Sequence, residues 1–263
     1  MSTKIDRLLE RLESRPLEEQ GLVVKEAVRA VAEADFFFFS KHILGYRDLR
    51  WSAHREPVLV LEGDATRKMV IMPRGTFKST LVSVAYPLWR LAKSPDMTIM
   101  LDSEVFTNSK NFLREIRNHL LSNERLRWLW GPWMGPVDNE SETIIKQRRR
   151  NRKEASITVG GIETVKVGQH YDLIIGDDYN SPKNSDTPEK CRKVIDHVRY
   201  NLNILNPGGE YVFAMTRYAE LDVAGWVLKE ILGEKFLAEG QLKLSSHDSI
   251  LADRQAEELD LIS

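Results

Sequence analysis

Apolar residues recur with helical spacing through the start of the chain. Residues 3–14 carry an apolar residue every three or four positions, which predicts an amphipathic helix ended by Pro16: Ile5, Leu8, Leu9 and Leu12. A second pattern of this kind predicts a helix over 17–34. Four consecutive aromatic residues, 36–39, follow it, and they cannot all face one way on a helix. We therefore expect this segment to be covered on nearly every side by core packing.

The pattern then becomes an alternation of short apolar runs with helical segments. A loop is expected over 44–56 and a short helix over 58–61. Apolar runs of strand length lie at 69–72, 97–101, 171–176 and 210–215. Helical spacing follows each run, at 81–91, 104–122, 187–205 and 221–232. This order predicts β-α-β crossovers. The fold class is therefore α/β, with a mostly parallel central sheet flanked by helices and an N-terminal helical segment.

Local signals mark two helix starts and an irregular middle section, 123–170. Asp102-Ser103 is expected to cap the helix of 104–122, and Thr187-Pro188 to start the helix of 187–205. Within the middle section, the tryptophan-rich stretch Trp128–Trp133 is expected to pack. Two short strands, at 142–145 and 156–159, are expected to bracket a basic run.

The basic run is residues 146–153, with six cations in eight residues. Such a run is a solvated face, a contact for a polyanion, or a source of catalytic arginines at a subunit interface. The net charge of the whole chain is −1 and its pI about 6.6, which argues against a protein that coats nucleic acid with its entire surface. A local contact with a polyanion stays open.

Composition also bears on the compartment. Cys191 is the single cysteine, so no intrachain disulfide can form, which fits a reducing environment. No stretch approaches the roughly 18 uninterrupted apolar residues of a membrane helix. The first ten residues include Asp6 and Glu10 and are unlike a signal peptide. We expect a soluble, intracellular protein that does not contact a membrane.

The chemistry of the chain centres on residues 68–80, KMVIMPRGTFKST, which read as strand, loop and helix. Backbone N–H groups of such a loop and the positive helix N-terminus cradle a polyphosphate, a lysine reaches the outer phosphates, and a hydroxyl ligates Mg²⁺. The residues that would contact the nucleotide are Arg74, Gly75, Thr76, Phe77, Lys78, Ser79 and Thr80. The full pattern has glycine where Met72 and Phe77 stand. The alternative is an ordinary strand-to-helix turn capped by Ser or Thr.

Two residues upstream of this loop extend the hypothesis. Trp51 and His54 are placed in sequence to lie against the base of a bound nucleotide. Packing alone is the alternative for Trp51.

Polar residues follow two later strands. Asp177 and Asp178 end the strand of 171–176, and ligands of parallel α/β sheets bind outside such strand ends. One carboxylate can hold Mg²⁺ and the other can orient or deprotonate an attacking water. Thr216 and Arg217 end the strand of 210–215 and are placed to sense a γ-phosphate. Taken alone, paired acids after a strand are often part of a turn.

The order of these motifs resembles the ATPase part of the large terminase subunit of tailed bacteriophages, the motor that packages DNA into proheads. Four stretches carry the likeness, from about residue 68 to 226: PRGTFKST, IMLDSE, GQHYDLIIGDD and GGEYVFAMTRY. The resemblance implies a P-loop NTPase fold of the additional-strand type, with ATP and Mg²⁺ as cofactors. It implies that Lys78 and Ser79 hold the phosphates and Mg²⁺.

The resemblance also assigns roles to the strand ends. Asp177 would be the carboxylate on the magnesium side, Asp178 would be catalytic, and Thr216 would couple hydrolysis to movement. Arg74 matches an arginine common in the phosphate loop of the family and would contact the γ-phosphate. Such motors work as rings in which a neighbour supplies an arginine, for which the candidates lie within 114–152.

The family implies partners and a location. These are double-stranded DNA, the portal protein, the small terminase subunit and further copies of the chain in a homo-oligomeric ring, with a monomer as the alternative for the isolated chain. The location implied is the cytoplasm of the infected bacterial host, docked on the prohead portal. We divide the chain into a helical segment at 1–56, an ATPase core at 57–236 and a linker or tail at 237–263.

Three departures from the family pattern stand out. Phe77 replaces glycine at a position of close backbone approach, which weakens or reshapes nucleotide binding. Asp178 replaces the glutamate usual across such ATPases. The sequence also contains no nuclease domain, which large terminases carry. The function expected is ATP hydrolysis that powers packaging of double-stranded viral DNA. The alternatives are a helicase-like ATPase stimulated by nucleic acid, and a non-hydrolysing nucleotide- or DNA-binding module.

Overall fold

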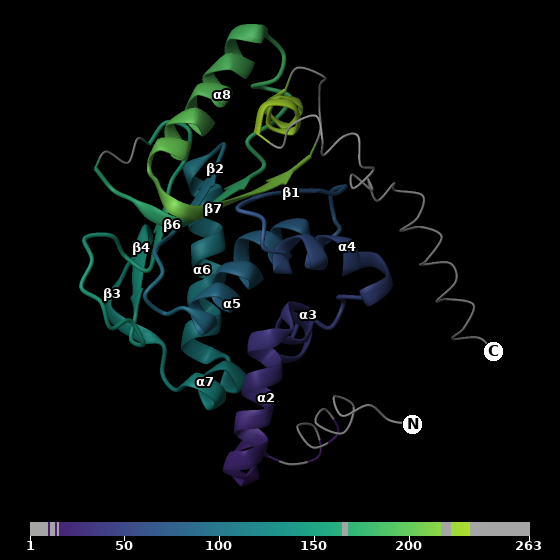
Figure 1. The fold of residues 1–263 in the computed structure, drawn as a ribbon, viewed down its shortest axis with the longest axis vertical. Coiled ribbons are helices and arrows are strands. Elements are labelled where there is room, and N and C mark those ends of the chain that lie inside the picture. The colour runs from purple at the N-terminus through teal and green to yellow at the C-terminus, as the bar shows by residue number, and fades with distance from the viewer. Residues whose placement is uncertain (1–9, 11–13, 15, 165–167, 217–221, 232–263) are drawn as a thin grey trace, which may run out of the picture.

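Seven strands form one sheet in the part of the chain that the structure, a computed structural model, describes: residues 10, 14, 16–164, 168–216 and 222–231 (Figure 1). The order across the sheet is β1-β7-β6-β2-β5-β4-β3. The first five strands in this order run parallel: β1 (Arg67–Ile71), β7 (Leu205–Met215), β6 (Tyr171–Asp177), β2 (Ile99–Ser103) and β5 (Ile157–Val159). The four predicted strands are confirmed, with bounds shifted by a few residues.

The far edge of the sheet is antiparallel. Strands β4 (Glu142–Ile145) and β3 (Met134–Asp138) complete a meander after β5 in space. The two short strands predicted on either side of the basic run are therefore confirmed as β4 and β5. Trp133 is buried beside them and Trp130 lies edge-on to it, as expected of packing residues.

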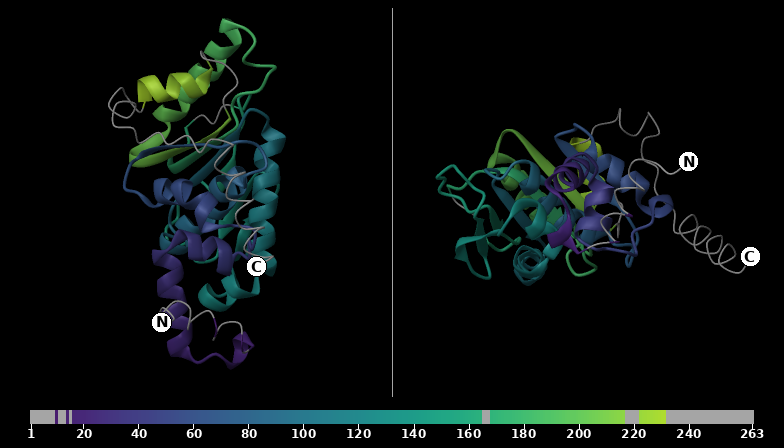
Figure 2. Two further views of the ribbon diagram at one scale, coloured as in Figure 1. Left: turned by 90° about the vertical axis from the view of Figure 1, so that its right-hand side faces the viewer. Right: turned by 90° about the horizontal axis from the view of Figure 1, so that it is seen from below.

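Helices cover both faces of the sheet, as Figure 2 shows from the side. One face packs on α8 (Pro188–Asn203) and α9 (Val223–Trp226), which continues as a π-helical turn, Val227–Ile231. The other face carries the remaining helices: α2 (Leu22–Ala34), α3 (Phe36–Phe38), α4 (Trp51–Glu62), α5 (Tyr86–Lys93), α6 (Phe106–Ser122) and α7 (Glu124–Trp130).

Alternation along the central strand explains the three layers. In β6, Leu173 and Ile175 belong to the apolar core under α6, whereas Ile174 belongs to the core under α8. Because neighbouring side chains of a strand point to opposite faces, a strand covered on both sides must be apolar throughout. The continuous apolar runs in the sequence are therefore the strands that carry helices on both faces.

The N-terminal helices pack into the apolar core on the α6 side of the sheet. The predicted helix of 17–34 is a 3₁₀ turn, Leu17–Glu19, followed by α2, and Val28 and Ala32 of α2 are fully buried. Phe36, Phe38 and Phe39 are buried as expected, in α3 and the π-helical turn Phe39–Ile43. The predicted helix at 3–14, apart from residues 10 and 14, and the tail at 237–263 lie outside the described residues.

The loop predicted over 44–56 is wrong in its second half, because α4 begins at Trp51. The sequence hides this start, since Arg50 is not a capping residue type and Pro57 lies inside the helix. The His54 Nδ1 lies 3.1 Å from the backbone nitrogen of Arg50 and 2.9 Å from its carbonyl oxygen, so it contacts the capping residue itself. No side chain caps the first turn.

The cap predicted at Asp102-Ser103 is also wrong. Both residues extend β2, where they pair with Gly176 and Asp177 of β6. Helix α6 starts after Val105 with no side-chain cap. The other predicted start is confirmed, since Thr187 accepts a hydrogen bond from the Lys190 N–H at the head of α8.

None of the described helices combines the length and apolar character that a bilayer-spanning segment requires.

Candidate active site

The candidate site lies at the carboxyl ends of β1, β7 and β6, which are neighbours in the sheet. The loop after β1 leads into a helix that begins at Lys78 and continues as a π-helical segment, Thr80–Ala85, into α5. The ends of β6 and β7 deliver Asp177, Asp178 and Thr216 beside this loop. Parallel strands thus bring together residues that are about 100 or more positions apart in the sequence.

The phosphate-type loop is held in a conformation that L-residues avoid. Gly75 has φ of 78° and Phe77 has φ of 59°. A bulky side chain in the left-handed region is strained by about 1–2 kcal/mol, so Phe77 stands where the backbone favours glycine. The Thr76 hydroxyl donates to the Pro73 carbonyl at 2.6 Å and braces the loop from inside.

Lys78 joins three elements. Its side chain is 5% exposed, and its Nζ forms an ion pair with Asp178 and donates to the Thr216 Oγ1 at 2.9 Å. The residues predicted for the phosphate, the attacking water and the coupling strand therefore meet at one ammonium group. The sequence prediction that these three lie together is consistent with this geometry.

Ser79 and Asp177 form the second pair of the site. The Ser79 hydroxyl donates to the Asp177 carboxylate at 3.0 Å, and the Ser83 hydroxyl donates to the other carboxylate oxygen. Burial raises the pKa of Asp177 to about 6, against the opposing effect of these hydroxyls and of Lys78. Sequence reasoning missed Ser83; the signal was its place one helical turn after Ser79.

The two adjacent carboxylates differ in setting. Asp177 is 2% exposed, whereas the side chain of Asp178 is 36% exposed. Asp178 also has φ of 42°, and its N–H donates to the Ala214 carbonyl of β7 at 2.8 Å. Asp177 is therefore enclosed beside two hydroxyls, while Asp178 is partly exposed, pairs with Lys78 and has a strained backbone.

The remaining loop residues lie around this centre. Arg74 is exposed near the tip of the loop, and Thr80 is partly buried at the start of the π-helical segment. Thr216 directly follows β7, and Arg217 lies outside the described residues. The roles of Arg74 and Thr80 toward a nucleotide stay predictions.

His54 packs against the phosphate-type loop. Its ring is 6% exposed, lies edge-on to the Phe77 ring at 6.1 Å and interacts with the backbone of Thr76. Burial lowers its pKa, which favours the neutral imidazole. Trp51, one turn earlier, is 46% exposed and packs edge-on against Phe37 at 5.2 Å. Of the two residues, His54 contacts the loop, and contact of either with a base stays a prediction.

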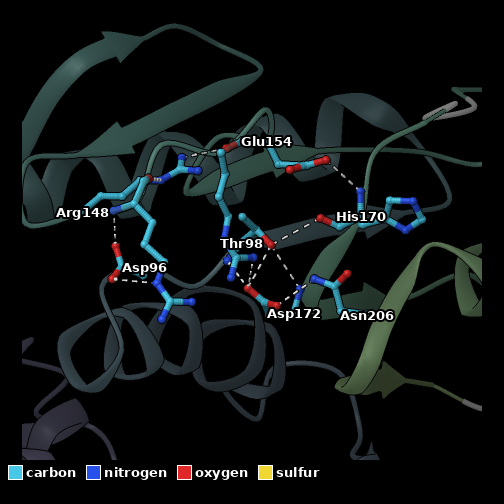
Figure 3. Close-up of polar contacts among 9 residues, drawn as sticks. Asp96, Thr98, Arg148, Glu154, His170, Asp172 and Asn206 are labelled. Carbon is cyan, nitrogen blue, oxygen red and sulfur yellow. Dashed lines mark hydrogen bonds and ion pairs between the residues drawn. The ribbon is translucent and has the colours of Figure 1, made fainter.

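The basic run lies near Asp96 and Asp172, at the amino ends of β2 and β6 (Figure 3). Asp96 accepts hydrogen bonds from the backbone N–H groups of Arg149 and Arg150, at 2.7 and 2.8 Å. Arg152 forms an ion pair with Asp172 near the start of β6, at 2.8 Å. The run therefore frames the amino ends of the strands and contributes no side chain to the candidate site of its own subunit.

The donor set of the site fits Mg²⁺ and a nucleoside triphosphate. Hard oxygen ligands suit Mg²⁺, and a hydroxyl and a carboxylate are paired at Ser79 and Asp177. Lys78 at a helix start beside the Gly75 turn suits an anionic phosphate chain. Within the described residues, His, Cys, Asp and Glu form no group of three or more that could hold a metal by themselves. The metal would thus rely on the hydroxyl and on the phosphates.

Comparison with known proteins supports the fold. None of the known protein-family models matches the chain. No curated protein matches it either. Among solved structures, the large terminase of bacteriophage HK97 aligns with a TM-score of 0.53 and 10% identity, over 76% of this chain and 41% of that one. An S. cerevisiae Dbp5 variant, in a complex with Nup159, Gle1, IP6 and ADP, aligns at 0.46 and 14% identity, over 74% and 49%.

The chain thus spans less than half of either protein it aligns with. At 10% identity the likeness to the terminase shows a shared fold and nothing beyond it. That fold is the predicted one, a mostly parallel P-loop NTPase sheet flanked by helices. Strand β7 is the additional strand, since it lies between β1, which carries the loop, and β6, which carries the acids.

Proposed function

We propose that this protein is a Mg²⁺-dependent ATPase that drives the movement of double-stranded DNA during viral genome packaging. One observation carries the ATPase part: Lys78 reaches both Asp178 and Thr216 while its neighbour Ser79 bonds to Asp177. Loop, metal-side acid and catalytic acid then stand in the relation that phosphoryl transfer requires.

In this proposal, the γ-phosphate replaces Asp178 as the partner of Lys78. An incoming γ-phosphate carries more negative charge than a carboxylate and competes for the ammonium group. Transfer of Lys78 to the phosphate releases the partly exposed Asp178, which then orients the attacking water. Bound Mg²⁺ supplies neutralisation of the charge that develops on the phosphate oxygens. Thr216 loses its contact with Lys78 in the same event, which links the bound nucleotide to the end of β7.

The packaging part rests on two supports. The four sequence stretches resemble the large terminase family in order and spacing, and the fold is shared with a phage large terminase. With this function the partners are double-stranded DNA, a portal protein, a small terminase subunit and further copies of the chain in a ring. The working location is the host cytoplasm at the prohead portal.

A neighbouring subunit completes the site in this proposal. The candidate arginines of 114–152 include Arg117, which forms an ion pair with Asp138, and Arg125, which donates to the His42 carbonyl. An arginine supplied in trans contributes on the order of 10³ to 10⁵ in rate. The isolated chain is therefore expected to turn over ATP slowly, and added portal protein or DNA is expected to raise the rate.

Steady-state ATP hydrolysis by the Lys78→Ala variant tests the ATPase part. We expect turnover to fall to background, because the variant loses the group that holds the phosphate. The matched control is Lys229→Ala, which removes a 72% exposed lysine near the end of the described chain. Equal turnover by Lys78→Ala and the native protein would sink the proposal.

One observation favours a second candidate, a non-hydrolysing nucleotide-binding module. Phe77 keeps a large side chain at a left-handed position of the loop, where a phosphate must approach the backbone closely. Calorimetry with ATP and Mg²⁺ separates the two candidates when combined with the turnover assay. Binding without turnover, even in the presence of DNA, favours the module.

A further inference from the structure

A buried carboxylate outside the candidate site gathers hydrogen bonds from distant parts of the chain. Asp102, in β2, is 1% exposed. Its Oδ2 accepts from the Tyr179 hydroxyl at 2.7 Å and from the Asn201 side-chain amide at 2.6 Å, and it lies 2.6 Å from the His197 Nε2. All of these contacts fall on Oδ2, and the buried Oδ1 has no hydrogen-bond partner among the described residues. Taking a carboxylate out of water is costly, so the three groups on Oδ2 are needed to hold Asp102 and are themselves held in place by it.

The partner that matters most is Tyr179, because it directly follows Asp178. Tyr179 is fully buried, and its ring folds back over the strand that precedes it. A methyl group placed on Gly176 would come within 2.2 Å of the Tyr179 Cε2. Only glycine at 176 therefore leaves room for the Tyr179 ring.

Asp178 carries the strained backbone of this segment, directly after β6. Its φ of 42° lies in the left-handed region, which costs a non-glycine residue energy and persists only when the surroundings enforce it. Two tethers lie next to it: the hydrogen bond of its own N–H to Ala214, and the buried Tyr179 hydroxyl on Asp102. Without the second tether, the backbone at Asp178 would relax toward ordinary φ and ψ angles.

The tether is braced from the other side as well. The Tyr179 hydroxyl lies 2.9 Å from the Tyr211 hydroxyl of β7, and the Asn201 amide on α8 reaches both Asp102 and Tyr211. Burial raises the pKa of Tyr179 well above its usual value, so the phenol stays a donor. This cluster connects β2, β7 and α8 to the residue that follows Asp178, yet Asp102 itself makes no contact with Lys78, Ser79 or Asp177 among the described bonds.

We propose that Asp102 is a positioning residue for Asp178: through Tyr179 it holds the strained backbone that aims the Asp178 carboxylate at the attacking water. This inference rests on the proposed ATPase function for its catalytic meaning. The structural claim, that Asp102 maintains the strained backbone at Asp178, can be measured separately.

Asp172, in the strand β6 that ends at Asp177, provides a matched control. It lies at the amino end of β6, and it accepts hydrogen bonds from the Thr98 N–H, the Arg152 guanidinium and the Asn206 amide, at 2.9, 2.8 and 2.8 Å. Both Asp102 and Asp172 are therefore carboxylates with several donors, and loss of either charge destabilises the fold. Of the two, only Asp102 bonds to Tyr179, the residue that follows Asp178.

The experiment compares Asp102→Asn, Tyr179→Phe and Asp172→Asn in the full chain. We expect Asp102→Asn to lower kcat on the order of tenfold to a hundredfold, the penalty of a displaced catalytic group, with the dissociation constant for ATP within about twofold of native. Tyr179→Phe keeps the ring on Gly176 and removes only the hydroxyl, so kcat is expected to fall in the same direction. Because the two act through one tether, the double variant is expected to lose no more than Asp102→Asn alone.

Hydrogen exchange at the Asp178 amide provides a readout that does not depend on turnover. We expect exchange at this amide to quicken in Asp102→Asn and Tyr179→Phe and to stay native in Asp172→Asn. Unchanged kcat and unchanged exchange in Tyr179→Phe would overturn the inference, even if Asp102→Asn fails to fold. Absence of ATPase activity in the native protein would refute the proposed function instead. The exchange result would still decide whether Asp102 maintains the strained backbone at Asp178.

Discussion

The two ends of β6 carry clusters of similar composition that are built for different purposes. At the amino end, Asp172 is surrounded by donors and by ordinary backbone (Figure 3). At the carboxyl end, Asp178 is exposed by about a third and its backbone is strained. The non-glycine residues with positive φ in the described part of the chain are Phe77 and Asp178, and both lie at this end.

Strain of this kind needs enforcement from the surrounding structure. The acid at the amino end is already paired, and no described non-glycine residue there has a positive φ, although the pairing of β6 with β7 is irregular between Tyr171 and Leu173. The carboxyl end is braced by Lys78, by the Ala214 carbonyl and by the buried cluster around Asp102. The contrast indicates that the contacts at the amino end of β6 stabilise the fold, whereas those at the carboxyl end hold a strained backbone. Variants at the two ends should therefore separate stability from activity.

The largest effect is expected at Asp178. The Asp178→Asn variant keeps the size of the side chain and removes the carboxylate that would orient or deprotonate water, so kcat should fall about 10²- to 10⁴-fold. Binding of ATP should be retained, since Lys78 is freed for the phosphate. Single-turnover hydrolysis and calorimetry measure the two quantities. Native kcat in this variant would remove Asp178 from the mechanism.

The pH dependence of Mg²⁺ binding gives the next largest effect. The pKa of Asp177 is raised from 3.8 to about 6, and only the carboxylate binds Mg²⁺, so metal-dependent activity should be lost as the pH falls through about 6. In the metal-free protein the sign for stability is opposite: the folded state binds the proton more tightly, so its stability falls as the pH rises from about 4 to about 6.

Ser83→Ala sharpens this test. The variant removes a hydroxyl that favours the Asp177 carboxylate, so the acid limb of the activity profile should move to higher pH by about one unit. Ser40→Ala is the control, because this buried serine bonds to the Phe36 carbonyl and makes no described contact with Asp177. A profile that stays in place in Ser83→Ala would contradict the assignment of the acid limb to Asp177.

A smaller effect is expected at Phe77. Phe77→Gly relieves a left-handed conformation and clears the approach to the loop backbone, which should strengthen binding of ATP with Mg²⁺ by about 1 kcal/mol, a factor of about five. Phe77→Ala removes the ring but keeps the backbone penalty, so it should bind more weakly than Phe77→Gly. Calorimetry distinguishes them. Equal affinity of the two variants would show that the backbone angle is not the cause.

The smallest effect on catalysis is expected at the amino end of β6. Asp172→Asn weakens charge-assisted hydrogen bonds and should lower the free energy of unfolding by about 1–3 kcal/mol while kcat stays native. Thermal unfolding and ATP turnover on one preparation check both parts. A large loss of kcat here would erase the proposed difference between the two ends.

The sequence was sufficient where chemistry follows directly on an apolar strand. Lys78, Asp177 and Thr216 each come just after a buried run, and parallel strands must bring such ends to one edge. For the same reason the fold class could be predicted before any side-chain geometry was known.

The sequence was insufficient where a residue acts through tertiary contacts. Asp102 resembles a helix cap by position, but its donors come from residues 179, 197 and 201, which are far away in the chain. Ser83 is hidden inside an apolar helical stretch. The start of α4 is masked by Pro57. In each case, neighbours in space decided the outcome against the local pattern.

The most direct test of the central claim is an experimental structure of the protein with Mg²⁺ and a non-hydrolysable ATP analogue. We expect the phosphates to lie over Gly75–Ser79, with Lys78 moved from Asp178 to the γ-phosphate and the metal beside Ser79 and Asp177. Phosphates bound elsewhere, or Lys78 still paired with Asp178 while the nucleotide is bound, would contradict the account.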